Sequence, residues 1–198
     1  MKNGIKNTVT IGLFLLLFHM NAFSQKEQSE QMIQMLDYSR PGTNHSLLGQ
    51  LVGTWNFQDS KLPFVKGTLV RKPIYDGRFF SVEITGGKIQ MPVADGKMKE
   101  DYYKSQQIEG YDNPRMGFYT SSINNHIGSD IQYQTGVYDA AEKKLIYDWD
   151  SELIKGKFQK DRRVIRMIDS SHYTETYFEQ RSGQYIKVRE LNYTKSGG

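Results

Sequence analysis

The chain has 198 residues, no cysteine and a formal net charge of +4 at pH 7. This length suits one domain with a single hydrophobic core, and the lack of cysteine excludes a disulfide framework or a lipid-modified cysteine. The basic residues are scattered and the net charge is small, so we expect no nucleic-acid partner.

The first 24 residues have the order of a secretory signal peptide. Lys2 and Lys6 precede an apolar run from Val9 to Phe18, and residues 22–24 (Ala-Phe-Ser) place small side chains where a signal peptidase reads. The run is about half of the roughly 20 apolar residues that a membrane span needs. We predict a cleaved signal peptide over 1–24, a periplasmic or extracellular protein, and no stable membrane anchor after cleavage. An uncleaved N-terminal anchor is the alternative.

An N-terminal helical segment is predicted over residues 25–52. Apolar residues recur at helical spacing over 26–38, and Arg-Pro-Gly at 40–42 ends that pattern. A second short helix is predicted from the spacing of Leu47, Leu48 and Leu51.

From residue 53 the apolar period becomes that of β-strands. Tyr133 and Val137 share one face of a strand whose other face carries Gln132 and Gln134. Turn-forming sequences separate runs of about 6 to 10 residues, a normal strand length. The predicted strands are Gly53–Asp59, Phe64–Arg71, Phe79–Thr85, Ile108–Tyr111, Met116–Ile123, Ile131–Tyr138, Lys144–Leu153, Phe158–Met167, Tyr173–Glu179 and Tyr185–Tyr193. Such a series predicts a meander that closes into a barrel or folds as a sandwich, and closure is favoured because it removes exposed edges.

The least regular part of the chain is Gly86–Gln107, which contains Gly-Gly, Met-Pro and Asp-Gly pairs before a lysine-rich stretch. We predict a crossing loop here, with one strand at Ile89–Met91 and a helical turn near Glu100. Long loops in compact domains are often lids or binding loops, but a solvated excursion explains the composition equally well.

Residues 41–55 (PGTNHSLLGQLVGTW) resemble the opening segment of a bacterial family known only as domain of unknown function 1579. Four shorter segments fit the same family, at 76–80 (DGRFF), 110–113 (GYDN), 136–139 (GVYD) and 176–179 (TYFE). The family is similar to calycins, the up-and-down barrels that include lipocalins. The resemblance therefore implies an all-β, antiparallel up-and-down calycin-like barrel of about 8–10 strands over residues 53–195. It implies no activity, because the family has none assigned.

Gly53 and Trp55 form the Gly-x-Trp pattern that also marks the first strand of lipocalins. We predict that Trp55 closes one end of the barrel and that Gly53 lets another backbone approach closely there. In barrels of this kind a basic side chain of the last strand often lies over the indole, and Lys187 or Arg189 is the expected equivalent. These roles are structural.

No residue is assigned to catalysis, metal binding or a cofactor. His45, His126 and His172 are far apart and lack the short paired spacing of a zinc site. Carboxylates at Glu175 or Glu190 could point into a cavity and act as an acid or base.

The chain is rich in aromatic residues, with 13 tyrosines, ten phenylalanines and two tryptophans. An aromatic body with a polar tip suits a pocket for a small hydrophobic or amphipathic molecule, which is the partner that we predict. The predicted ligand-binding residues, expected in the lumen, are Tyr119, Tyr133, Trp149, Arg166, Glu175 and Tyr177. Arg166 is expected to pair with a carboxylate head group.

Two other functions remain open from the sequence. One is an enzyme that uses a lumen carboxylate together with tyrosines. The other is an envelope interaction module that uses the N-terminal helix or the segment 86–107 as its contact surface. A filled barrel without a ligand is the structural alternative to all of them.

Overall fold

The computed structural model describes residues 27–93, 96–128 and 130–197. The chain divides into two compact units, residues 1–40 and 41–198. In the first unit residues 27–38 are helical, and the side chains of Met32, Ile33, Met35 and Leu36 are exposed. The predicted signal peptide lies outside the described residues. Among the helices that are described, none combines the length and apolar character needed to span a membrane.

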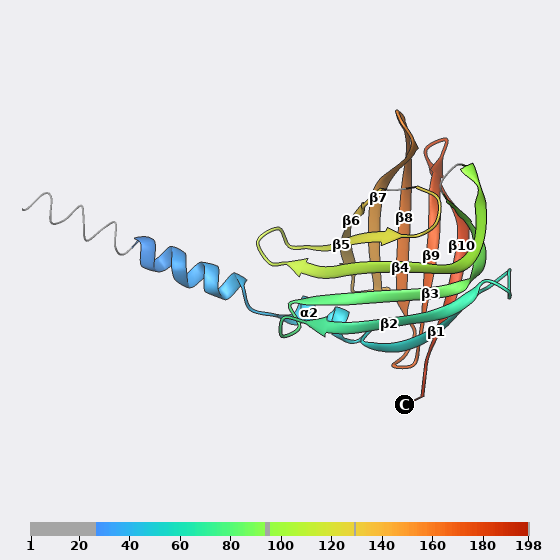
Figure 1. Ribbon diagram of the computed structural model, residues 1–198. Coiled ribbons are helices and arrows are strands. Elements are labelled where there is room, and N and C mark those ends of the chain that lie inside the picture. The colour runs from blue at the N-terminus through green and yellow to red at the C-terminus, as the bar shows by residue number, and fades with distance from the viewer. Residues whose placement is uncertain (1–26, 94–95, 129, 198) are drawn as a thin grey trace, which may run out of the picture. The chain divides into compact units, whose positions relative to one another are not determined.

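The second unit is a closed barrel of ten antiparallel strands, preceded by the short helix α2 (Thr43–Gly49) (Figure 1). The strands are β1 (Gly53–Asp59), β2 (Lys66–Ile74), β3 (Phe79–Pro92), β4 (Met98–Asp112), β5 (Gly117–Asn124), β6 (Gln132–Asp139), β7 (Lys144–Ile154), β8 (Lys157–Met167), β9 (His172–Arg181) and β10 (Gln184–Lys195). Each strand pairs with its neighbours in sequence, and β1 pairs with β10 to close the barrel. The predicted antiparallel up-and-down barrel is confirmed.

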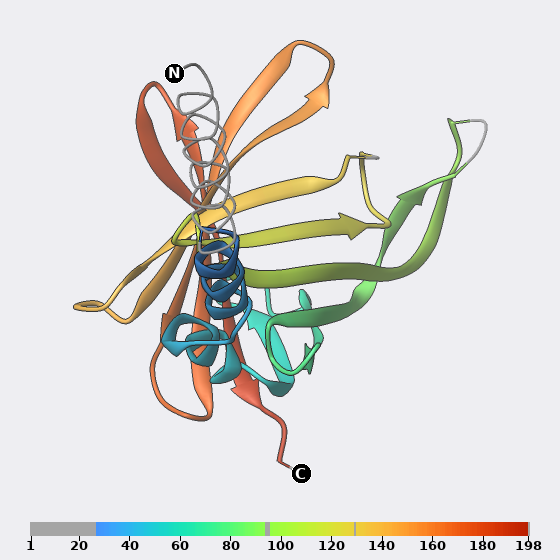
Figure 2. The ribbon, with the colours of Figure 1, turned by 90° about the vertical axis from the view of Figure 1, so that its left-hand side faces the viewer.

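The crossing loop and helical turn predicted within Gly86–Gln107 are wrong, although the strand expected at Ile89–Met91 lies within β3. Residues 86–92 continue β3 and residues 98–107 belong to β4, and the two strands form a long hairpin that bends away to one side of the barrel (Figure 2). The pair Gly86-Gly87 lies at a register shift between Thr85 and Lys88, so these glycines mark an irregularity within a strand. A Cβ on Gly86 would lie 3.0 Å from the Cβ of Tyr103, which shows how closely the two strands approach there.

One end of the barrel is closed by α2 and the first strand, as the Gly-x-Trp pattern predicts. Trp55 is 1% exposed, and its indole Nε1 donates a hydrogen bond to the carbonyl oxygen of Leu51 at 2.9 Å. Its ring meets the ring of Tyr173 edge-on at a centroid distance of 4.7 Å. Leu48 of α2 and Leu51 belong to the same buried cluster, so the helix and the indole seal this end together.

The basic residue over Trp55 is Lys195, rather than Lys187 or Arg189. Lys195 is the cross-strand partner of Trp55, and its Nζ lies 5.3 Å from the indole centroid. Arg189 lies away from the ring, with its Nε 3.7 Å from a carboxylate oxygen of Asp59. Gly53 has a φ of 136°, and a Cβ there would approach Lys195 Cε to 2.8 Å. The close approach that this glycine permits is therefore that of the lysine side chain.

Candidate functional site

The inner face of the barrel contains buried charges. Arg71 of β2, Glu109 of β4, Arg163 of β8 and Glu175 of β9 are each at most 2% exposed. Successive side chains of a strand point to opposite faces, and in each of these strands the charged residue lies on the face that points into the barrel. Buried charges are uncommon unless they are paired or hydrogen-bonded, so their contacts show what each one does.

Arg71 and Glu109 form a complete bidentate ion pair. The distance from Nε to Oε2 is 2.9 Å and from Nη2 to Oε1 is 3.2 Å, while Nη1 donates to the carbonyl oxygen of Leu51 at 3.3 Å. Burial is the largest influence on the pKa of Arg71 and acts to lower it, but the charge and hydrogen bonds of Glu109, together with Tyr173 and Glu175, outweigh burial and raise the pKa. This pair connects β2 to β4 and to the segment that leads into β1, which is a structural role.

Arg163 is buried with much weaker contacts. Its Nη1 lies 3.4 Å from Gln107 Oε1 and its Nη2 lies 3.5 Å from Thr120 Oγ1, both at the limit for a hydrogen bond. Nη2 is 3.7 Å from Glu109 Oε1, whose carboxylate is already shared with Arg71. The guanidinium lies over the ring of Tyr147 at 4.8 Å, and its Nε has no hydrogen-bond partner in the protein.

Glu175 is satisfied on one oxygen only. Tyr177 donates its hydroxyl to Oε2 at 2.7 Å, and Tyr193 donates to the same oxygen at 3.3 Å. Two hydroxyl groups therefore donate to a single oxygen of this carboxylate. Burial, and then the charge of Glu175, raises the pKa of Tyr177 well above its ordinary value, so this tyrosine stays a donor. The other oxygen, Oε1, is buried without a partner.

The buried polar atoms that lack a partner gather on one side of the barrel. Among the described residues six such atoms occur, all on the inner faces of the consecutive strands β6 to β9: Gln134 Oε1, Tyr147 Oη, Trp149 Nε1, Arg163 Nε, Tyr173 Oη and Glu175 Oε1. Tyr147 interacts with Thr120 and Tyr173 interacts with Arg71, and each interaction lowers the pKa of that tyrosine against the larger effect of burial. These two hydroxyl groups are therefore not counted as unmet. The other four atoms therefore carry the argument: two donors and two acceptors that protein structures rarely leave unmet. We call the residues that hold these four atoms, Gln134, Trp149, Arg163 and Glu175, the polar arc.

The structure brings together three of the six predicted ligand-binding residues. Trp149 of β7 and Glu175 and Tyr177 of β9 all lie on the inner face, with β8 between these two strands. The other three, Tyr119, Tyr133 and Arg166, do not lie in the lumen.

Tyr119 lies on the outer face, because buried Phe118 and Thr120 flank it, and Tyr133 is 70% exposed. Arg166 is also outside, where its Nη2 bonds Glu142 at 2.6 Å. For Tyr133 the expectation placed the apolar face of the strand inward, whereas β6 turns its glutamine face inward.

Several residues of the interior were missed from the sequence. Arg71, Glu109 and Arg163 are charged, and a charge on a strand is ordinarily assigned to the wet face. One signal was available at Gly136, which lies on the inner face next to Tyr147. A Cβ on Gly136 would lie 2.6 Å from Tyr147 Cδ1, so the glycine leaves room for the ring on which Arg163 stacks.

The other carboxylates and the histidines give no comparable site. Glu190 lies outside, where its Oε2 accepts from Lys187 at 2.6 Å, and this hydrogen bond lowers the pKa of Glu190. Asp148 pairs with Arg162 across β7 and β8, as an ion pair on the outer face. His45 accepts a hydrogen bond from the Gly42 amide on Nδ1 at 3.0 Å, and burial lowers its pKa. Within the described residues no three His, Asp or Glu side chains are grouped to hold a metal ion.

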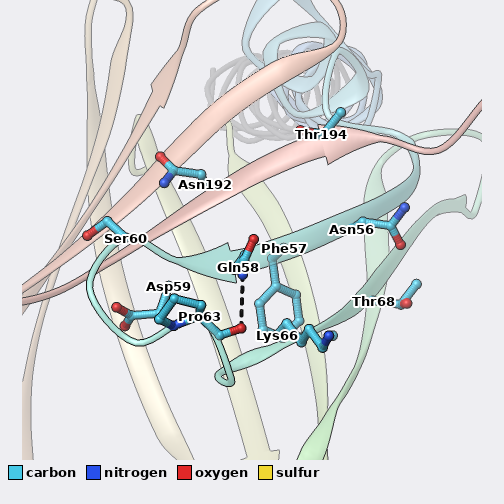
Figure 3. A pocket seen from close by; sticks show the side chains of 11 residues that line it. Asn56, Phe57, Gln58, Asp59, Ser60, Pro63, Lys66, Thr68, Asn192 and Thr194 are labelled. Atoms are coloured by element: carbon cyan, nitrogen blue, oxygen red, sulfur yellow. Dashed lines mark hydrogen bonds between the residues drawn. The ribbon is translucent and has the colours of Figure 1, made fainter.

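An open pocket of about 620 Å³ lies along β10, β1 and β2 (Figure 3). Several of its polar side chains, among them Asn56 and Asn192, are exposed, and Gln58 Nε2 already donates to the Pro63 carbonyl at 2.9 Å. None of the six unpartnered atoms lies on it. Water can satisfy this surface, so the polar arc is the stronger candidate.

Comparison with known families agrees with the resemblance seen in the sequence. The profile of a family described as "Protein of unknown function (DUF1579)" matches residues 40–195, and the chain belongs to this family. A search of curated proteins finds no match. The family supplies no activity, so function has to be argued from the polar arc.

Proposed function

We propose that this family member binds a small amphipathic molecule inside its barrel, with the polar group of that molecule held by Arg163 and Glu175. The observation that carries the proposal is that Arg163 Nε and Glu175 Oε1 are both buried and both lack a partner. A buried charge with an unmet hydrogen bond is unfavourable, and a ligand that pairs with it recovers that free energy.

The surroundings of these two groups favour an amphipathic ligand over a purely apolar one. Gln134 and Trp149 add an acceptor and a donor on neighbouring strands. The Trp149 indole is only half-buried, and Tyr177 lies on the same inner surface. Aromatic faces of this kind bind an apolar or ring-shaped part while their polar tips fix its orientation.

Native mass spectrometry of gently purified protein tests the proposal, with Arg163→Met and Arg166→Met as a matched pair. Arg163 faces the lumen and Arg166 faces solvent. We expect a co-purifying molecule on the wild type and on Arg166→Met, and its loss from Arg163→Met. Bare protein in repeated preparations, or a molecule that Arg163→Met retains, would contradict it. The spectra also give the mass of the mature chain, which we expect to lack residues 1–24 if the protein is exported.

An enzyme is the second candidate, because the carboxylate of Glu175 is buried beside the Tyr177 hydroxyl at 2.7 Å. A pair of this kind can transfer a proton. Tyr177→Phe separates the two functions. An enzyme that loses this hydroxyl accumulates its substrate, so the bound mass changes from that of the wild type, whereas a binding protein retains the same molecule.

A further inference from the structure

We infer that the polar group of the ligand is electrically neutral and both donates and accepts a hydrogen bond, as a hydroxyl or a carboxamide does. This inference rests on the proposed binding in the lumen. It follows from the balance of buried charge around the polar arc and from the kinds of atom that are left unmet.

The buried cluster is already electroneutral. Arg71 and Glu109 neutralise each other through their bidentate contact. Arg163 and Glu175 are the second pair of opposite charges, and the charge of Glu175 is the strongest of those that raise the pKa of Arg163 against the effect of burial. Among the described residues no ion pair joins these two side chains directly, so each keeps one unmet atom facing the same interior.

An ionised head group would upset this balance. A carboxylate would accept from Arg163 but would leave the cluster with an excess negative charge, and an ammonium would do the reverse at Glu175. Excess charge in a buried site costs far more than a neutral hydrogen bond returns. Asp161 lies half-buried on the same inner face as Arg163, where burial raises its pKa and its Oδ2 accepts a hydrogen bond from Ser151 at 2.6 Å.

A neutral group that both donates and accepts meets the two needs at once. Its oxygen accepts from Arg163 Nε and its N–H or O–H donates to Glu175 Oε1. The remaining acceptor and donor, Gln134 Oε1 and Trp149 Nε1, suit a second group of the same kind.

Three probes of one shape test the inference by calorimetry: benzamide, benzoate and benzylammonium. For the wild type we expect benzamide to bind at least about tenfold more tightly than either ion. Glu175→Gln gives the cluster one excess positive charge, and we expect the preference for benzoate over benzamide to rise by about tenfold or more. Glutamine keeps an oxygen for the Tyr177 and Tyr193 hydroxyls, so this variant should fold. Glu142→Gln removes an exposed carboxylate on the outer face and serves as the control.

The outcomes separate the two proposals. If benzoate binds the wild type best, or Glu175→Gln changes the preference no more than Glu142→Gln does, the head group is not neutral, although the lumen site stands. If no probe binds any of the three proteins, the polar arc is not a ligand site and both proposals fail.

Discussion

Two buried arginines share the interior of this barrel, and their contacts differ. Arg71 makes a bidentate pair with Glu109 and a third bond to a backbone carbonyl. Arg163 makes only contacts of 3.4 Å or longer to oxygen atoms, and its nearest opposite charges are Glu109, already in use, and Glu175, which it does not touch.

The difference separates a structural role from a binding role. A complete pair contributes rigidity, and removing one partner leaves an uncompensated charge. An incomplete pair stabilises the fold less, but it keeps donors and acceptors available for a ligand. The comparison therefore predicts that the two pairs respond differently to mutation.

The difference between the two arginines depends on an interior that excludes water. Unfolding at alkaline pH tests this, and the expected change in the free energy of unfolding is the largest of those predicted. Burial raises the pKa values of Tyr147, Tyr173, Tyr177 and Tyr193. In the unfolded chain these groups lose their protons near pH 10. The unfolded state therefore gains stability as the pH rises above about 10, by about 1.4 kcal/mol per pH unit for each tyrosine and about 5.5 kcal/mol per pH unit for all four.

Denaturant unfolding between pH 9 and 11, with tyrosinate absorbance followed in the native state, checks this. Stability should fall steeply above pH 10 while the four interior tyrosines remain protonated in the folded protein. If every tyrosine of the folded protein ionises together near pH 10, the interior is wet and the comparison loses its basis.

Breaking the complete pair should have the next largest effect. Glu109→Gln leaves the buried guanidinium of Arg71 without its counter-charge, so we expect the free energy of unfolding to fall by about 3–5 kcal/mol. Arg163→Met should cost less, about 1–2 kcal/mol, because its hydrogen bonds are long. Urea denaturation of both variants gives the two values. Equal losses would mean that the two arginines play the same role.

Gly136→Ala tests the support beneath Arg163. The added methyl group would lie 2.6 Å from a buried ring atom of Tyr147 and 3.0 Å from the carbonyl oxygen of Ile146. Overpacking of this kind costs about 1–3 kcal/mol. Gly49→Ala is the control, because a Cβ there meets nothing within 4 Å. A Gly136→Ala protein as stable as that control would show that Tyr147 has room to move.

The sequence predicts the closed end of the barrel better than it predicts the lumen. At the closed end, Gly53 and Trp55 carry a local pattern that fixes their place. The role of Trp55 was predicted, whereas the group that approaches Gly53 is the Lys195 side chain and not a backbone segment. Alternation along the chain gave the barrel and the right partition of β6 into two faces, with Gln134 and Tyr133 on opposite sides.

The sequence could not show which face of β6 points inward. Charged and amide side chains line this interior because they meet partners from strands far away in the chain, such as Arg71 with Glu109, 38 positions apart. Arg162 and Arg163 are adjacent in the sequence, but Arg162 lies on the outer face and Arg163 is buried inside the barrel. Only the closed barrel determines which is which, and the same holds for the continuation of β3 and β4 through 86–107.

Lys195 gives the smallest expected effect and concerns the closed end. Its ammonium lies 5.3 Å from the Trp55 centroid, so Lys195→Met should lower stability by about 0.5–1 kcal/mol through loss of the cation–π contact. Arg189→Met, at the residue first expected to lie over the ring, should leave Trp55 fluorescence unchanged. If Lys195→Met leaves stability unchanged and Arg189→Met changes the fluorescence of Trp55, then Arg189 is the residue that lies over the ring.

A high-resolution crystal structure of gently purified protein tests the central claim most directly, by the electron density between Arg163 and Glu175. We predict a bound organic molecule there, with one atom within hydrogen-bond distance of Arg163 Nε and another within reach of Glu175 Oε1. A direct ion pair between the two side chains, with no molecule between them, would contradict the account.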